Sequence, residues 1–101
     1  MTGPSVRSLA ESLRATLRAL GISRGVARAR ALEAWPVVAQ GLLGADARRT
    51  HALRIDGETL VVAVPSPVLA QELRLHAERL IAELARQAPE AEVRAVRFVP
   101  R

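Results

Sequence analysis

The chain has 101 residues, 50% hydrophobic and 25% charged, a composition typical of one compact domain and not of a disordered tail. All 15 basic residues are arginine, against 10 acidic residues, which gives a formal net charge of +5. The absence of cysteine excludes disulfides, thiol nucleophiles and thiolate metal sites. We see no secretory signal and no apolar run near the roughly 20 residues of a membrane span, and therefore expect a cytoplasmic protein.

The first half of the chain has helical periodicity, and we expect two helices within residues 5–43. Residues 6–20 place apolar side chains at helical spacing and arginines on another face, which is typical of an amphipathic helix. Ser8 begins a capping box, with Ser5 as an alternative start, and Gly21 is placed to end the helix.

A second apolar stripe runs from residue 23 to about residue 43 and includes Trp35. Its members are Ala31, Leu32, Trp35, Val38, Ala39 and Leu42. Proline removes a backbone donor and disfavours helical geometry in the preceding residue. Pro36 therefore predicts a kink or a restart of this helix at Trp35.

The pattern then changes to that of strands, and we expect a hairpin over residues 50–64. A β-branched run follows Asp56-Gly57, which is a strong hairpin turn signal. Ser66 is placed as the N-cap of a following helix, with Pro67 at its first position.

That helix is expected over residues 66–87, with an apolar stripe that includes Leu69, Leu73, Leu80 and Leu84. Val68 and Leu75 lie off this stripe. One interpretation is that an N-terminal helix covers them, and the alternative is that they form a partner-binding patch.

A last short strand is expected over residues 92–99, which completes the order ααββαβ. The predicted fold class is α+β, a single domain over residues 1–101 with a small three-stranded sheet packed by helices on one face. The pattern leaves open whether the last strand lies beside the first or the second. Arg54, Arg94 and Arg97 are candidates to line the open face of the sheet.

Groups able to carry catalysis are sparse, and we expect no enzyme, no metal site and no cofactor. His51 and His76 have neither metal-ligand spacing nor a neighbouring thiol. The run from Gly41 to Gly44 has the GxxG spacing of a KH loop, but its middle pair is apolar, and we favour a helix C-terminus and turn.

Charge is distributed unevenly along the chain. Residues 1–54 hold nine arginines and three acids, a net charge of +6, whereas the remaining residues have a net charge of −1. Such clustering suits a polyanion, although a solvated helix face explains it equally well. The candidate phosphate contacts are Arg7, Arg14, Arg18, Arg24, Arg28, Arg30, Arg48 and Arg49. With Trp35 and Phe98 as the only aromatic residues, base stacking is not expected.

The order of motifs resembles the DciA family over about residues 25–99. The resemblance rests on the tryptophan helix at Trp35-Pro36, the hairpin at 53–64, Ala70-Gln71-Glu72-Leu73 in the next helix, and the strand from Val93 to Phe98.

This resemblance implies a bacterial replication factor that operates or loads the DnaB-type replicative helicase, with a KH-like fold and affinity for DNA. The expected partners are the helicase and single-stranded or forked DNA, bound with little sequence preference at the nucleoid. The resemblance transfers no catalytic residue. Two alternatives stay open: an RNA-binding KH-like module, and a protein-interaction adaptor whose contact surface includes Val68 and Leu75.

Overall fold

A single long helix, α1 (Val6–Leu43), forms the N-terminal part of the molecule in the computed structural model, which describes the backbone of residues 6–101 and the side chains of residues 8–101. The predicted helix end at Gly21 is therefore wrong. Helix formation is cooperative, and starting a second helix costs more than including one glycine, at about 1 kcal/mol relative to alanine. Ser8 lies inside α1, and the alternative cap Ser5 lies outside the described residues.

Pro36 is also accommodated within α1, so the helix does not restart at Trp35. The proline removes one backbone hydrogen bond, but the turns around it bury Trp35, Val38 and Ala39 in the core. This packing holds the helix together across the proline. α1 ends at Leu43, and Gly44, with φ of 60°, leads into the short helix η1 (Gly44–Arg49). The GxxG run is thus a helix terminus, as expected.

The hairpin forms as predicted, from β1 (His51–Asp56) and β2 (Thr59–Val64). Its two-residue loop begins with Gly57 at φ of 62°, a conformation that glycine adopts without strain. The two strands are antiparallel, and a bulge at Leu53 shifts their register.

The region expected as one helix over residues 66–87 contains two, α2 (Pro67–Leu75) and α3 (Ala77–Gln87). Ser66 caps α2 as predicted, its Oγ accepting a hydrogen bond of 3.1 Å from the Leu69 backbone N–H. His76 leaves helical geometry between the two helices, with φ of −111° and ψ of 17°. The break lets α2 pack against β2 and β3 while α3 packs against α1.

The last strand, β3 (Ala95–Pro100), begins later than the expected residue 92 and follows the short helix η2 (Pro89–Ala91). Glu92 adopts a left-handed conformation, with φ of 54°, which delays the start of strand pairing. β3 lies parallel to β2, giving the sheet order β1-β2-β3. The last strand therefore lies beside the second strand and not beside the first, a choice that the sequence pattern left open.

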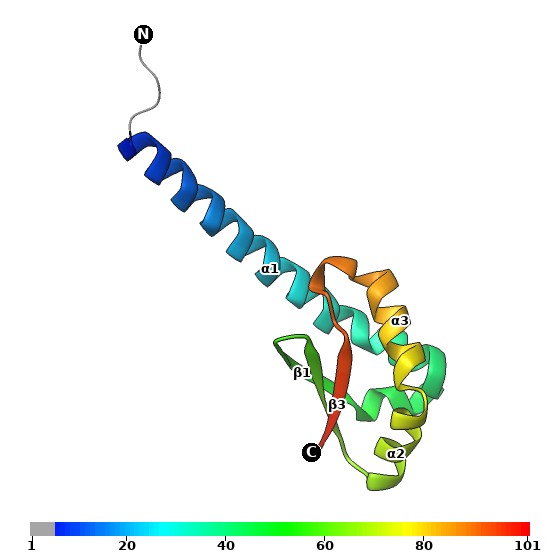
Figure 1. Cartoon of the computed structure of the whole chain (residues 1–101). Helices are drawn as coiled ribbons and strands as arrows, with labels where there is room; N and C mark the ends of the chain where they lie inside the picture. The colour runs from blue at the N-terminus through cyan, green and yellow to red at the C-terminus, as the bar shows by residue number, and fades with distance from the viewer. Residues whose placement is uncertain (1–5) are drawn as a thin grey trace.

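One face of the sheet carries the hydrophobic core. The core side chains of β2 alternate along the strand, as the period of a strand requires, and are Leu60, Val62 and Val64. They pack with Trp35 of α1 and with Leu80 and Leu84 of α3. The helices gather on this side of the sheet (Figure 1). The α+β class is confirmed, and the arrangement is consistent with the expected KH-like order.

Candidate nucleic-acid and partner interfaces

The N-terminal half of α1 projects from the body of the molecule as an isolated arm, which we define as residues 8–26 (Figure 1). It gives the molecule an elongated shape, with extents of 69 × 23 × 18 Å. Every described arm residue is exposed except Ala10, which is partly buried, and the first buried residue after the arm is Ala27. The arm therefore offers its side chains to solvent around the whole helix.

Four arginines line one side of α1. At about 100° per residue, Arg14, Arg18, Arg24 and Arg28 fall within about a third of the helix circumference. From Arg14 to Arg28 they extend over about 21 Å at 1.5 Å per residue. We call these four residues the arginine ridge. The same geometry places Arg30 outside the ridge, and the side chain of Arg7 lies outside the described residues.

Ion pairing separates the ridge from the arginines of the sheet. In the part of the chain that the structure describes, no ion pair within 4.0 Å joins a ridge arginine to a carboxylate. Several arginines of the second half do pair with carboxylates: Arg54 and Arg97 with Asp56 at 3.0 and 3.7 Å, Arg94 with Glu58 at 3.8 Å, and Arg86 with Glu83 at 3.1 Å. Among the described residues, the ridge guanidinium groups are therefore open to an external anion, as are those of Arg30, Arg48, Arg74, Arg79 and Arg101, and what distinguishes the ridge is that its four arginines share one side of α1.

The last two arginines of the predicted set lie in η1, away from the ridge. Arg49 approaches Asp46 at 4.0 Å, and both side chains are exposed. Arg48 lines a shallow pocket with His51 and Pro36. The structure thus brings four of the eight predicted arginines onto one surface and places Arg30, Arg48 and Arg49 elsewhere.

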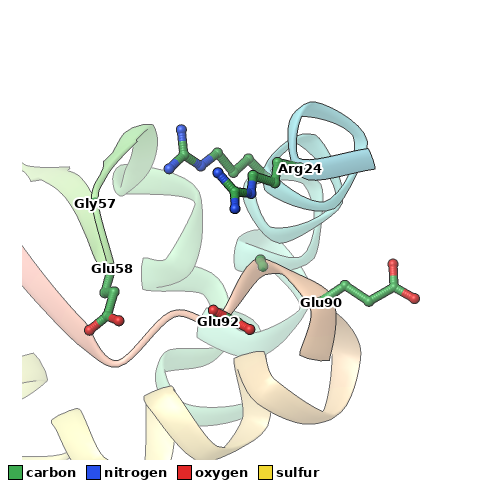
Figure 2. A pocket seen from close by; sticks show the side chains of 7 residues that line it. Arg24, Gly57, Glu58, Glu90 and Glu92 are labelled. Carbon is green, nitrogen blue, oxygen red and sulfur yellow. The ribbon is translucent and has the colours of Figure 1, made fainter. Parts of the chain in front are cut away.

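A pocket of mixed charge lies where the arm meets the body. Its lining residues are Arg24, Arg28, Gly57, Glu58, Glu90, Ala91 and Glu92. Arg24 points from α1 into this pocket, whereas Glu90 points away from it (Figure 2). Opposite charges face each other across this pocket without a direct ion pair in the described chain.

The open face of the sheet is covered by arginine side chains. Val61 has no exposed surface, yet it does not belong to the core that the helices cover. Its cross-strand partners are Arg54 on β1 and Arg97 on β3, so all three side chains share this face. The arginine stems shield the valine while Asp56 pairs with both guanidinium groups. Sequence analysis placed these arginines here but missed Asp56, which strand alternation puts on the same face as Arg54.

Val68 and Leu75 are both 78% exposed on α2. The interpretation that an N-terminal helix covers them is therefore wrong, because α1 packs against α3 and not over this side of α2. Seven residues apart, they lie on one face of the helix. Between them on that face lie Gln71 and Glu72, which are also exposed.

Other chemistry finds little support among the described residues. No group of three or more His, Cys, Asp or Glu side chains in residues 8–101 is arranged to hold a metal ion. His51 lies exposed at the start of β1, and His76 lies between α2 and α3. Trp35 and Phe98 are buried, with ring centroids 6.5 Å apart, so neither presents a face for base stacking. None of the described helices is both long and apolar enough to span a membrane.

Comparison with known protein families gives a match over most of the chain. The family model described as "Dna[CI] antecedent, DciA" matches residues 8–98, which is nearly the whole described chain. No curated protein matches the sequence.

Proposed function

The chain belongs to the DciA family, whose members serve as loaders of the replicative helicase DnaB, and we propose that it is a non-enzymatic replication factor that binds DNA and helps load this helicase. The family match over residues 8–98 is the observation that carries the proposal. It acts in the cytoplasm, at the nucleoid, where its DNA and helicase partners meet.

For the DNA contact we propose the arginine ridge. Its four guanidinium groups lie on one side of an exposed helix, and in the described chain no carboxylate pairs with them. A span of about 21 Å corresponds to about six phosphates of one strand in a B-form duplex, at 3.4 Å of helix axis each. Because Trp35 and Phe98 are buried, the contact is to the phosphate backbone, with little preference for sequence.

We propose secondary contacts with the DNA backbone at Arg7, Arg30, Arg48 and Arg49. Arg48 and Arg49 lie at the other end of α1, where they can hold a strand that extends past the ridge. Single-stranded or forked DNA is the expected substrate, because a flexible strand can follow arginines that do not share one plane.

For the helicase contact we propose the exposed face of α2. Val68 and Leu75 are both 78% exposed, the highest exposure among the large hydrophobic side chains of the described chain, and they share one helix face. The face is separate from the arginine ridge in sequence and in structure. One chain can therefore hold DNA and helicase at the same time.

The proposal is tested by size-exclusion titration of the protein with the replicative helicase of its own host, with and without single-stranded DNA. We expect co-elution with the helicase and a ternary complex when DNA is added. DNA binding without any helicase complex would contradict the loader role. A clear preference for RNA over DNA of the same sequence would instead favour an RNA-binding module.

A further inference from the structure

The arm carries a stripe of leucines that the body of the molecule does not cover. Leu9, Leu13, Leu17 and Leu20 are between 52% and 59% exposed, although their spacing places them on one face of α1. We call these four residues the leucine stripe. Exposed apolar side chains in a row on one helix mark a surface that packs against another molecule.

The leucine stripe leads into the core-facing side of the same helix, with Arg24 on that face between Leu20 and Ala27. Ala27, Ala31 and Trp35 follow it at helical spacing, and all three are buried against the body. The body therefore lies on the same side of α1 as the stripe, beyond its C-terminal end (Figure 1). Any occupant of the stripe must be narrow and must end before the body begins.

We propose that the stripe pairs with the same stripe of a second copy of this chain, with the two arms antiparallel. In this register Leu9 faces Leu20 of the second copy and Leu13 faces Leu17. The leucine spacing is thus self-complementary to within one residue, or about 1.5 Å along the axis, and self-complementarity is the condition for a two-fold symmetric interface. Each body then lies beyond the N-terminal end of the described arm of the other copy.

The position of the body excludes other arrangements. A parallel pairing would bring both bodies to the same side at the same end, and they would collide. A flat membrane surface would meet the body before it reached the full length of the stripe. A second arm has the right width, because packed helix axes lie about 8–10 Å apart.

The flanks of the stripe determine how this pairing responds to salt. On one flank stand Ser12, Ala19 and Ser23, small side chains that allow close approach of two helices. On the other flank stands Arg14, about 100° from the middle of the stripe, whereas Arg18 lies farther round, toward Ile22 on the opposite face. Two-fold symmetry places this flank beside its own copy, so the two Arg14 guanidinium groups lie near each other and repel, and added salt screens this repulsion.

Paired arms therefore associate more tightly as salt rises, whereas DNA binding weakens. A contact of four leucines from each copy over about 18 Å of helix is smaller than a standard interface. We expect a dimer of micromolar or weaker affinity, which phosphate groups bound between the arginines would stabilise.

Sedimentation equilibrium of the full chain, without DNA or helicase, tests the pairing over micromolar to millimolar concentrations. We expect a monomer-dimer equilibrium that shifts to dimer with added sodium chloride, and that Leu17→Asp abolishes. The matched control is Ile22→Asp, which changes an aliphatic side chain, 69% exposed, on the opposite face of the same helix. Trp35 fluorescence shows that the body stays folded in both variants.

The orientation is tested with spin labels, because the chain has no cysteine and a single Ser23→Cys variant carries one label per copy. Antiparallel pairing in this register separates the two positions by roughly 25 Å along the axis. A separation near the interaxial distance of about 10 Å would indicate parallel pairing and overturn the proposal.

Three further results would overturn it: a monomer at all concentrations and salt conditions, equal loss of the dimer in Leu17→Asp and Ile22→Asp, or binding of a monomeric chain to phosphatidylglycerol vesicles through the stripe. The measurement contains neither DNA nor helicase. A result that overturns the arm pairing therefore does not contradict the proposed loader function. Likewise, a result that contradicts the loader function does not overturn the arm pairing.

Discussion

The indole Nε1 of Trp35 donates a hydrogen bond of 3.0 Å to Oγ1 of Thr50, which in turn donates one of 2.7 Å to the backbone oxygen of Ala47. Both side chains are buried, and Thr50 is the one polar residue among the buried residues of the described chain. This chain of bonds fastens α1 to the entry of β1. It also satisfies the indole N–H, which could not otherwise be buried without cost.

Thr50→Val tests this bond. The valine has nearly the same shape but leaves the indole N–H without an acceptor, which costs about 1–3 kcal/mol. For a domain of this size each kcal/mol lowers the melting temperature by about 4–8 °C. Thr50→Ser keeps the hydroxyl and serves as the control. Equal melting temperatures for the valine and serine variants would show that the bond contributes little.

Gly21→Ala and Gly25→Ala are expected to stabilise the arm. Neither glycine has positive φ, and a Cβ at either position meets nothing within 4 Å. Alanine is favoured over glycine inside a helix by about 0.5–1 kcal/mol. Because the arm opens independently of the body, hydrogen exchange of its amides reports this gain, and we expect slower exchange there with little change in β2. Faster exchange in the arm would contradict its helical state.

The arginine ridge predicts a salt-dependent effect on DNA binding. The double variant Arg14→Ala with Arg18→Ala is expected to weaken binding of single-stranded DNA by about tenfold. The slope of log affinity against log salt should fall by about 0.7 for each lost phosphate contact.

The matched control for the ridge is Arg86→Ala. Arg86 is exposed but already paired with Glu83 at 3.1 Å, so its loss removes one positive charge without removing a free guanidinium group. Fluorescence anisotropy at several salt concentrations measures both variants. If Arg86→Ala weakens binding as much as each ridge substitution does, net charge and not the ridge governs the contact.

The exposed face of α2 predicts a variant that separates folding from helicase binding. Leu75→Asp is expected to keep the wild-type melting temperature, because the side chain is 78% exposed, and to lose the helicase complex. Val37→Asp, at another aliphatic position that is 61% exposed, should keep both. Leu73→Asp, at a position with no exposed surface, should unfold the domain. Helicase binding retained in Leu75→Asp would exclude this face of α2.

The parts of the fold that local signals specify could be predicted from the sequence. The hairpin that Asp56-Gly57 predicts, the Ser66 cap with Pro67, and the stripe around Trp35 all appear as expected, because each depends on neighbouring residues. Glycine and proline within α1 led to wrong predictions of a helix end at Gly21 and a restart at Trp35, because cooperative helix formation and burial of Trp35 outweigh their local preferences.

Features that depend on long-range contacts could not be predicted from the sequence, for a different reason. The break at His76 follows from α2 and α3 packing on different partners, and the place of β3 beside β2 follows from that crossover. The arginines were identified as a set, but their pattern alone did not show which ones Asp56, Glu58 and Glu83 neutralise. That distinction required the folded structure.

The most direct test of the account is helicase loading onto closed circular single-stranded DNA, which a ring-shaped helicase cannot thread from an end. The replicative helicase of the same host is incubated with the circles, with and without this protein, and the helicase retained on DNA is measured. We predict more helicase on the circles with the wild-type chain, and no increase with Leu75→Asp. The same amount of helicase with and without the wild-type protein would contradict the loader function.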